Sequence, residues 1–596
     1  MPSYTPPLRD MRFILHEVLE ITRHKDVPQF AALSEEDIDS ILAEAGRYAS
    51  EVAQPLNAVG DRQGCRWHDG QVFTPEGFRD AYRRYVEGGW PSLTAPAEYG
   101  GQGLPKILGV AVVEMLTASN WGLSSYPGLT AHAVTPLHHF GSEELKTTFL
   151  PKMISGEWSA TMNLTEPHAG SDLGLLRTRA VPSADGSYRI SGTKIFITAG
   201  EHDLAENIVH LVLARLHDAP PGVKGISLFL IPKFLVRSDG TLGDRNAVRC
   251  SRVEEKMGIH SSATCELVYD NAIGFLVGEP NRGLAAMFTM MNEARLGAGV
   301  QGVAIADVAY QNAVAYARSR RQGRLPAGAL EPTASADPII AHPDIRRMLL
   351  SIRSFSEGAR ALTFWGALQA ELAEHHPQED TRREAADLLD ALTPVIKAHL
   401  TDEGFEAASM AVQCLGGHGY IREWGLEQFV RDARIAPIYE GTNGVQAMDL
   451  IGRKLFAHGG RCIEAFLTIV RQCCNANVDD LKLQAMLAQL GTLLTAAETS
   501  TRTLQQRIPS EPMLAGAVAA DYLKVIGILA MGYMWARMCK VAIERLTADT
   551  SQRSYYMAKL ALGEFYFSKS LPVAHTSLAR IETGAEPVLA MPLESY

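Results

Sequence analysis

Apolar residues recur at helical spacing through the first third of the chain. The segment SEEDIDSILAEAGRYASEVA, residues 34–53, repeats Ile, Leu, Ala, Tyr and Val on one face of a helix. Ser34 and Asp37 form a capping pattern at its start. The segment 107–119 is a second predicted helix, and Ser142 followed by two glutamates predicts the start of a third.

Near residue 160 the pattern changes to short runs that are rich in Ile, Val and Phe and are bounded by Gly, Asp or Pro. Four such runs predict strands, over 188–200, 207–216, 225–236 and 265–278. The connections between them are too short for crossover helices, so hairpins or meanders are expected. The middle of the chain is therefore predicted to form an antiparallel barrel or sandwich.

Helical periodicity returns near residue 284 and continues in long segments to the C-terminus. These segments cover residues 285–320, 342–376, 383–417 and 480–508. The order predicts a mainly α protein with one β-domain. The expected domains are an N-terminal extension 1–33, a helical domain 34–159, a β-domain 160–280, a helical bundle 281–458 and a further helical domain 459–596.

Composition narrows the possible functions. The 596 residues carry a net charge of −11 and are 46% hydrophobic, which is typical of a globular protein and opposes a nucleic-acid-binding surface. The eight cysteines form no CxxC pair, which predicts reduced thiols in a cytosol-like compartment. The N-terminus lacks the apolar run of a signal peptide, and the apolar segment 525–536 is too short to cross a bilayer. A cytoplasmic protein without an integral membrane segment is expected.

One glycine motif is interpreted as structural. GAGVQG, residues 297–302, matches the dinucleotide-binding pattern GxGxxG, but that pattern requires a strand before it and a helix after it. Here the glycines lie inside a long helical segment. They are expected to allow close packing of helices.

Four other segments carry candidate chemistry, and each has a plain structural alternative. TMNLTEPHAGSDLG (161–174) is either a binding loop or a surface turn, and Phe196 with Thr198 either flank a flat ring or complete a core edge. QCLGGHGYI (413–421) is either a phosphate-approaching loop or a helix end. In APIYEGTNGVQAMDLIG (436–452), Glu440 follows Ile438 and Tyr439, and an apolar setting would raise its basicity. The histidines show no metal-binding spacing, so no metal site is expected.

Together these segments resemble motifs of the acyl-CoA dehydrogenase family. TEPHAGSD is similar to TEPxAGSD, IFIT stands where the family has W-I-T, and QCLGGHGY resembles Q-x-x-GG-x-G. EARLGAGVQGVA resembles the helix with the substrate-contacting arginine, and IYEGTNGVQ resembles the segment with the catalytic glutamate. The matches keep their order over roughly residues 35–455. The N-terminal extension and the C-terminal helices resemble a subgroup of about 600 residues that includes 3-methylmercaptopropionyl-CoA and long-chain acyl-CoA dehydrogenases.

The resemblance implies the fold of that family: an N-terminal helical domain, a middle β-barrel or sandwich and a four-helix bundle, with an extra C-terminal helical domain. It also implies FAD as the cofactor and assigns site residues by motif. The implied FAD contacts are Met162, Leu164, Thr165, Ser171, Phe196, Thr198, Arg320, Gln413, Gly416, Gly417, Thr442 and Asn443. The implied substrate contacts are Ser171, Asn292, Arg295 and Gly441. The sequence departs from the family pattern at His168, Met162, Phe196 and Asn292, and in SRRQGR around Arg320.

The implied reaction is α,β-dehydrogenation of an acyl-CoA thioester to the trans-2-enoyl-CoA, with Glu440 as the general base. A fatty acyl-CoA or 3-methylmercaptopropionyl-CoA is the candidate substrate, which would place the enzyme in β-oxidation or in dimethylsulfoniopropionate degradation. An electron-transfer flavoprotein is the implied acceptor, and a homodimer is expected. Three alternatives remain: an acyl-CoA oxidase, a flavin monooxygenase or nitroalkane-type enzyme, and a DNA-binding member of the fold. Glu440 opposes the second, and the negative net charge opposes the third.

Overall fold

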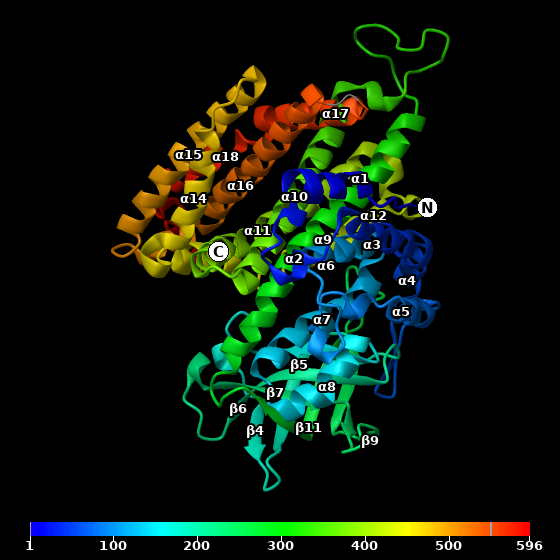
Figure 1. Ribbon diagram of the computed structural model, residues 1–596, viewed down its shortest axis with the longest axis vertical. Helices are drawn as coiled ribbons and strands as arrows, with labels where there is room; N and C mark the ends of the chain where they lie inside the picture. The colour runs from blue at the N-terminus through cyan, green and yellow to red at the C-terminus, as the bar shows by residue number, and fades with distance from the viewer. Residues whose placement is uncertain (1, 549–550) are drawn as a thin grey trace. The chain divides into compact units, whose positions relative to one another are not determined.

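The structure is a computed structural model that describes residues 2–548 and 551–596 (Figure 1). The chain divides into two compact units. One unit is Glu44–Ala294, and the other combines Met1–Ala43 with Arg295–Tyr596. The N-terminal extension, the bundle and the C-terminal helices, which the sequence analysis separated, therefore share one unit.

The unit Glu44–Ala294 contains a seven-stranded sheet. Five of its strands pair in the closed order β11-β5-β4-β6-β7-β11, which makes a barrel, and β10 and β3 extend it. This arrangement confirms the prediction of a β-domain. The strands are β1 Arg66–His68, β2 Gln71–Phe73, β3 Trp158–Asn163, β4 Arg179–Pro182, β5 Tyr188–Thr198, β6 Asn207–Leu216, β7 Ile226–Pro232, β8 Phe234–Val236, β9 Leu242–Arg245, β10 Val248–Val253 and β11 Thr264–Val277.

Most of the strand pairs are antiparallel, as the short connections predicted, but β6 is an exception. It pairs in parallel with β3, starting from Trp158 opposite Asn207, and in parallel with β4. Seven residues of β7 are buried without interruption, and the first eight of β6 are too. This continuous burial explains why these two strands read as apolar runs and not as alternating patterns.

Helices of the same unit begin where the sequence supplies caps. The hydroxyl of Ser142 accepts a hydrogen bond from the backbone N–H of Leu145 at 3.3 Å, at the start of α8. The side chain of Asn120 accepts one from Leu123 at 3.0 Å, at the start of α7. The helices are α4 Asn57–Gln63, α5 Phe78–Glu87, α6 Lys106–Ser119, α7 Trp121–Phe140 and α8 Glu143–Ser155, and α3 Glu35–Tyr48 and α9 Gly283–Ser319 cross the boundaries between the units.

The predicted cap at Ser34 is also present. The Ser34 hydroxyl accepts from the backbone N–H of Asp37 at 3.1 Å, and the Asp37 carboxylate accepts from the backbone N–H of Ser34 at 3.1 Å. This reciprocal pair satisfies two donors that the first helical turn leaves free.

The second unit is built from long helices. α9, α10 and α11 form its bundle with the short helices α12 and α13, and α14–α18 follow as the C-terminal block (Figure 1). Trp535 of this block donates its indole N–H to the carbonyl oxygen of Ser354 in α10 at 3.0 Å. The bounds are α1 Leu8–Arg12, α2 Pro28–Ala31, α10 Pro343–His375, α11 Glu379–Leu415, α12 Leu426–Ala433, α13 Asn443–Asp449, α14 Arg461–Cys474, α15 Leu481–Arg507, α16 Pro512–Ala548, α17 Arg553–Phe565, α18 Val573–Glu582 and α19 Glu586–Leu589.

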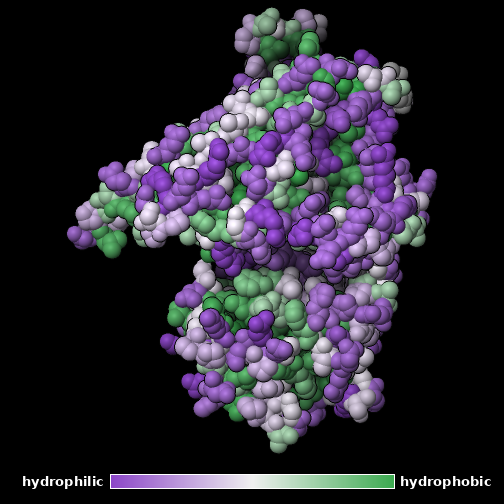
Figure 2. All heavy atoms as spheres, turned by 60° about the vertical axis from the view of Figure 1, so that its left-hand side comes forward, coloured by the Kyte–Doolittle hydropathy of each residue, from purple (hydrophilic) through white to green (hydrophobic). Residues whose placement is uncertain are grey.

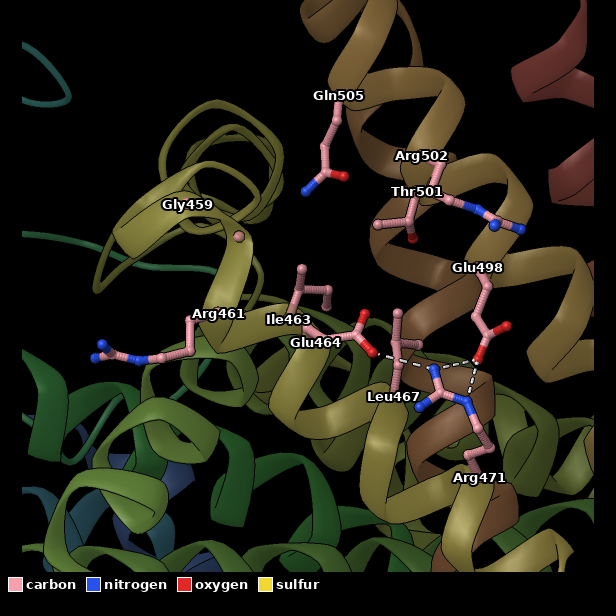
Figure 3. A pocket seen from close by; sticks show the side chains of 11 residues that line it. Gly459, Arg461, Ile463, Glu464, Leu467, Arg471, Glu498, Thr501, Arg502 and Gln505 are labelled. Carbon is pink, nitrogen blue, oxygen red and sulfur yellow. Dashed lines mark hydrogen bonds and ion pairs between the residues drawn. The ribbon is translucent and has the colours of Figure 1, made fainter. Parts of the chain in front are cut away.

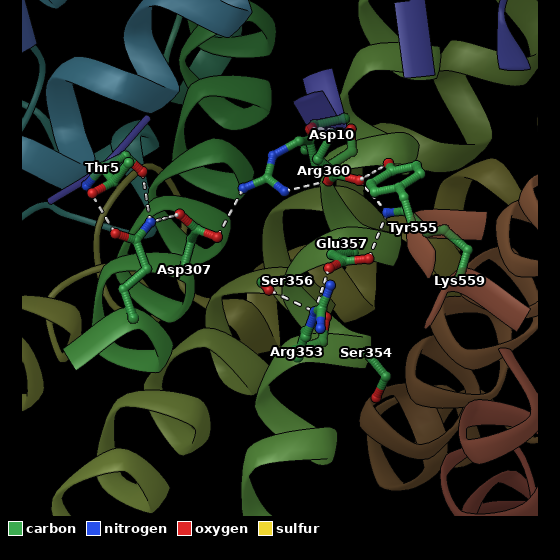
Figure 4. Close-up of polar contacts among 12 residues, drawn as sticks. Thr5, Asp10, Asp307, Arg353, Ser354, Ser356, Glu357, Arg360, Tyr555 and Lys559 are labelled. Atoms are coloured by element: carbon green, nitrogen blue, oxygen red, sulfur yellow. Dashed lines mark hydrogen bonds and ion pairs between the residues drawn. The ribbon is translucent and has the colours of Figure 1, made fainter. Parts of the chain in front are cut away.

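A buried ion network connects three parts of this unit that lie far apart in the sequence (Figure 4). Asp10 of α1 contacts Lys559 of α17 and lies 2.5 Å from the Arg360 guanidinium of α10. Lys559 also lies 2.5 Å from Glu357, and Arg360 lies 3.2 Å from Asp307 of α9. The network explains why the N-terminal extension folds with the C-terminal helices.

The GxGxxG segment lies inside α9, as predicted, and its glycines Gly299 and Gly302 face α11. A Cβ atom on Gly302 would lie 2.2 Å from the carbonyl oxygen of Leu400, and one on Gly299 would lie 2.6 Å from Ile396 Cγ2. Both distances are shorter than any relaxed contact, so the two helix backbones can approach only because these side chains are absent.

We therefore expect Gly302→Ala to destabilise the protein by about 1–3 kcal/mol through overpacking, despite the better helix propensity of alanine. Gly516→Ala in α16 is the matched control, because a Cβ atom there meets nothing within 4 Å. That change should stabilise the protein by about 1 kcal/mol. Urea unfolding measures both, and equal midpoints for the two variants would contradict the packing argument.

Within the described residues, α16 is the single helix whose length and apolar composition would allow it to cross a membrane. The helix is longer than the apolar segment 525–536, which by itself is too short to cross a bilayer, and its most apolar window is 67% buried inside the protein. Tyr522, Ile526 and Met534 of this helix are fully shielded from solvent. Hydrophilic residues cover most of the helical region on the face that Figure 2 shows.

Candidate active site

Glu440 lies in a tight turn between α12 and α13. Its backbone is left-handed, with φ of 55°, and Gly441 follows with φ of 81°. The side-chain amide of Gln446 donates to the carbonyl oxygens of both residues at 3.3 Å. A Cβ atom on Gly441 would lie 2.5 Å from that amide nitrogen, so the turn requires glycine. A non-glycine residue in this conformation stores strain, which is common at functional sites.

The next two residues anchor the turn. The Thr442 hydroxyl accepts from the backbone N–H of Val445 at 3.2 Å and caps α13. The backbone N–H of Asn443 donates to the carbonyl oxygen of Pro437 at 3.0 Å and closes the loop around Glu440. The carboxylate is therefore held on a rigid backbone.

The Glu440 carboxylate has the electrostatics of a base. Burial raises its pKa from the ordinary value of 4.5 to about 7, and the positive charges of Lys397 and Arg295 oppose that rise. Neither its carboxylate nor its backbone N–H forms a hydrogen bond within residues 2–548 and 551–596. A carboxylate that titrates near pH 7 can accept a proton from a weak carbon acid at neutral pH.

The neighbours of Glu440 differ from the sequence expectation in one respect. Ile438 was expected to supply apolar surroundings, but it is 47% exposed. Tyr439 instead directs its hydroxyl to the side-chain carbonyl of Gln301, within the glycine-rich segment of α9. That segment therefore helps to position the turn.

Asn292 and Arg295, the two residues of α9 that are predicted to bind the substrate, differ in their exposure to solvent. Asn292 is exposed on α9, whereas Arg295 is buried and its guanidinium lies 3.7 Å from Asp449. Burial lowers the pKa of Arg295, and Asp449 and Glu440 oppose this. The role of both residues in binding CoA stays a prediction.

In the unit Glu44–Ala294, the residues that are predicted to contact the flavin lie on two adjoining segments. The backbone N–H of Ile195 in β5 donates to the carbonyl oxygen of Thr165 at 2.9 Å, and the ammonium of Lys194 donates to that of Leu164 at 2.9 Å. These contacts bring the segment after β3 alongside the end of β5. Met162, Leu164, Thr165 and Thr198 are all partly exposed there.

Phe196 is the clearest mark of a binding surface in this unit. Its side chain is 61% exposed, and its backbone is left-handed with φ of 60°. The pairing of β5 with β11 is irregular at this point. The bulge turns a large aromatic ring toward solvent, where a flat ring could pack against it.

The TEPHAGSD loop combines structural and exposed residues. Glu166 is 3% exposed, pairs with Lys194 at 2.8 Å and accepts from the backbone N–H groups of Arg177 and Thr178. It therefore holds the loop together. Ser171 is exposed, and the His168 imidazole lies 3.1 Å from the carbonyl oxygen of Leu175.

The glycine-rich end of α11 is open. Gln413, Gly416 and Gly417 are exposed, and a Cβ atom on either glycine would meet nothing within 4 Å. The imidazole of His418 stacks on Trp424 at 4.7 Å and bonds the Tyr316 hydroxyl at 2.8 Å, which fixes this short segment. Arg320, just after α9, is exposed.

Each of these sets, taken by itself, suits one part of FAD. Exposed backbone glycines and an exposed arginine suit a pyrophosphate, and the strained, exposed Phe196 suits a flat ring. The described part of the chain contains no group of three or more side chains that could hold a metal ion.

A separate cavity of about 380 Å³ lies between α14 and α15 (Figure 3). Its Arg471 pairs with Glu464 at 3.1 Å and with Glu498 at 2.6 Å, so its central charges are already neutralised. We therefore do not place the chemistry there.

Three residues near Glu440 escaped the sequence analysis: Lys397, Gln301 and Gln446. Lys397 is fully buried in α11, 43 positions before the glutamate, and only the fold brings the two together. Its place on the apolar face of a predicted helix could have indicated a buried lysine that needs a charged or polar partner.

The chain matches four consecutive family models. They are the N-terminal domain of acyl-CoA dehydrogenase over residues 35–157, its middle domain over 161–272, its C-terminal domain over 281–456, and an acetyl-CoA dehydrogenase C-terminal-like domain over 463–592.

Known proteins align with nearly the whole chain. It is 41% identical to a 3-methylmercaptopropionyl-CoA dehydrogenase of Ruegeria pomeroyi, over 99% of this chain and 100% of the relative. It is 34% identical to a broad-specificity linear acyl-CoA dehydrogenase of Mycobacterium tuberculosis, over 98% of each chain.

Solved structures show the same fold. ACDH-11 of Caenorhabditis elegans in complex with C11-CoA superposes with a TM-score of 0.78 at 22% identity, covering 95% of this chain and 91% of that one. An acyl-CoA dehydrogenase of Bacillus anthracis complexed with FAD gives a TM-score of 0.73 at 20% identity, covering 94% and 89%. The ordered motifs and the full-length similarity lead to one conclusion: the chain belongs to the acyl-CoA dehydrogenase family and is an FAD-dependent oxidoreductase that acts on an acyl-CoA.

Proposed function

We propose that Glu440 is the general base that removes the α-proton of the acyl-CoA thioester. The observation that carries this proposal is a carboxylate whose pKa is raised to about 7, held without a hydrogen bond in a strained, anchored turn. A carboxylate with an ordinary pKa would be a weaker base, and a hydrogen-bonded one would lose basicity.

The turn also has a donor for the thioester oxygen. The backbone N–H of Glu440 has no acceptor among the described residues. A donor aimed at the oxygen would stabilise the enolate-like charge that develops as the proton leaves. FAD, when bound, supplies the acceptor for the hydride that leaves the β-carbon.

We also propose which residues of the chain bind the flavin. The exposed set around Phe196 and the open set around Gly416 support FAD binding by Met162, Leu164, Thr165, Ser171, Thr198, Arg320, Gln413 and Gly417. Thr442 and Asn443 extend this set from the catalytic turn. The Asn443 side-chain amide is bonded to α11 and its backbone N–H to Pro437, so its contribution is to hold the turn in place.

The proposed substrate is 3-methylmercaptopropionyl-CoA or a fatty acyl-CoA, because relatives with such names align over the whole chain. On α7, the hydroxyl of Ser124 bonds that of Thr117 at 2.9 Å, and Ser125 bonds Ser262 at 2.7 Å. A Cβ atom on Gly128 of the same helix would meet nothing within 4 Å. The free space at Gly128 could hold part of an acyl chain, which supports the proposed substrate class.

The purified protein is expected to be yellow and to hold FAD noncovalently. Mixed anaerobically with a series of acyl-CoAs, including 3-methylmercaptopropionyl-CoA, it should lose its flavin absorbance within the normal turnover time for at least one of them. Slow reoxidation in air would separate a dehydrogenase from an oxidase. Colourless protein that cannot be reconstituted with FAD, or a spectrum that no acyl-CoA changes, would refute the proposal.

We further propose a cytoplasmic homodimer that passes electrons to an electron-transfer flavoprotein. The C-terminal helices support the dimer, because they cover part of the bundle through contacts such as Trp535 with Ser354. Light scattering at micromolar concentration tests the assembly, and a tetramer would contradict it. Failure of purified electron-transfer flavoprotein to reoxidise the reduced enzyme would contradict the acceptor.

A further inference from the structure

Lys397 of α11 is a buried cation with a neutral hydrogen-bond partner. Its side chain is fully shielded from solvent, and its ammonium donates to the side-chain carbonyl of Asn443 at 2.7 Å. No salt bridge to Lys397 is formed within the described part of the chain. An isolated buried ammonium is costly, so its charge requires compensation from a nearby acid.

Two acids could compensate the Lys397 charge, Glu440 and Asp402. Burial lowers the pKa of Lys397 from 10.5 to about 8, while Glu440 and then Asp402 oppose this. Burial also raises the pKa of Asp402, whose carboxylate accepts from the Asn443 amide at 2.7 Å. Glu440 exerts the larger opposing influence on Lys397 and is therefore the main compensating charge.

The second cation near Glu440 is already paired. The Arg295 guanidinium lies 3.7 Å from Asp449, which in turn lies 2.5 Å from Arg453. The charged groups that face Glu440 are thus Lys397 from α11 and Arg295 from α9. Of these two, Lys397 is the one that forms no salt bridge with a carboxylate among the described residues.

Lys397 also helps to anchor the catalytic turn through its hydrogen bond to Asn443. The amide nitrogen of Asn443 donates to the carbonyl oxygen of Ala398 at 3.1 Å and to the Thr401 hydroxyl at 3.0 Å. Together with the bond from Lys397, these contacts fix the residue three positions after Glu440 to one turn of α11. The same lysine therefore touches the anchor of the turn and faces the charge that the turn carries.

We propose that Lys397 is a positioning residue for the base: it anchors the Glu440 turn through Asn443 and supplies positive charge that favours the ionised form of the Glu440 carboxylate. This inference rests on the proposed role of Glu440. Through Lys397, α11 would then help to set the pH range in which the enzyme is active.

The test is the pH dependence of flavin reduction in Lys397→Met, measured by anaerobic stopped flow from pH 5.5 to 9. The methionine keeps the length of the side chain but removes its charge. The rising limb of the plot of reduction rate against pH should move to higher pH by about one unit or more. At a given pH on the acid side of the profile, the rate should therefore be about tenfold lower than in the wild type. Partial recovery of the rate at high pH is expected, because Glu440 still ionises there.

Lys524→Met is the matched control. This lysine also faces α11, where its ammonium lies 3.5 Å from Glu403, and it is partly exposed. Its replacement should leave the profile in place. A purely structural role of Lys397 would lower the rate by the same factor at every pH without moving the limb, and that result would overturn the proposal.

Lys397→Gln separates the two parts of the role, because glutamine can still donate a hydrogen bond but carries no charge. A shifted limb in this variant supports the charge effect even if Lys397→Met does not fold. If neither variant folds and retains FAD, Lys397 serves the stability of the bundle and the proposal is wrong. Failure of the base assignment itself would look different, because Glu440→Gln would then reduce its flavin at the wild-type rate.

Discussion

Glu440→Gln is expected to abolish reduction of the flavin by substrate while leaving FAD and acyl-CoA bound. The amide is nearly isosteric with the carboxylate, so the strained turn that Gln446 and Thr442 hold should survive. An amide cannot accept the α-proton, and loss of a general base costs on the order of 100- to 10,000-fold in rate. Anaerobic stopped flow measures the reduction, and the perturbed flavin spectrum reports that substrate still binds.

Glu423→Gln is the matched control, since Glu423 is exposed on the short segment after the glycine-rich loop. It should reduce its flavin at the wild-type rate. Glu166 is unsuitable as a control because its replacement would leave Lys194 buried beside a neutral amide. If Glu440→Gln kept the wild-type rate, the base would have to be sought elsewhere.

Glu440 also makes the stability of the protein depend on pH. Burial raises the pKa of Glu440 to about 7, so the folded state resists ionisation between pH 4.5 and 7 whereas the unfolded chain ionises freely. The stability that the protonated form gives below pH 4.5 is therefore lost as pH rises through 7. Glutamine does not titrate, so the thermal midpoint of the wild type should fall relative to that of Glu440→Gln as pH rises from 4.5 to 7.5.

Lys559→Met is expected to have the largest effect on stability, with a loss of about 3–5 kcal/mol. The variant keeps the volume of the side chain but removes the cation that Asp10 and Glu357 share in a buried site. Among the described residues, Asp10 then keeps only Arg360, and Glu357 keeps only Arg353, as a cationic partner. Removing one partner of a buried ion pair is more destabilising than the loss of the contact itself, because the remaining carboxylates stay shielded from water. Urea unfolding measures the effect, and proteolysis should detect release of the N-terminal extension.

Lys482→Met tests whether burial causes the effect. Lys482 lies 2.5 Å from Glu564, but the two side chains are 65% and 43% exposed. Exposed pairs contribute about 0–1 kcal/mol, so this variant should unfold near the wild-type midpoint. Equal losses in the two variants would contradict the argument from burial.

Acid should weaken the same network. Burial alone would raise the pKa of Asp10, but Lys559 and Arg360 outweigh it and lower the pKa from 3.8 to about 2. The stability that ionised Asp10 contributes is therefore present above pH 4 and is lost as pH falls toward 2.

Much of the local structure could be predicted from the sequence, because its causes are local. The Ser34 and Ser142 caps, the β-rich middle and the helical GxGxxG segment all follow from side chains within a few residues of each other. The parallel pairing of β3 with β6 could not be predicted, since it joins segments more than 40 residues apart and leaves no local pattern.

The candidate site divides in the same way. The order of motifs predicted Glu440, and the glycine after it marked a special backbone conformation. The expected apolar cover by Ile438 was wrong, because the side of a turn that faces solvent depends on what packs against it. Lys397 and Gln301 reach the turn from helices distant in sequence, and no spacing rule connects them to it.

The sequence by itself determined the family, the order of helices and strands, and which carboxylate is the candidate base, because periodicity, caps and motifs are written in neighbouring residues. Only the tertiary structure decided that α11 carries the cation facing Glu440 and that Asp10 joins the extension to α17. Charge effects of this kind depend on distance and burial in space. Both are set only when segments that are not neighbours in the sequence pack together and exclude water.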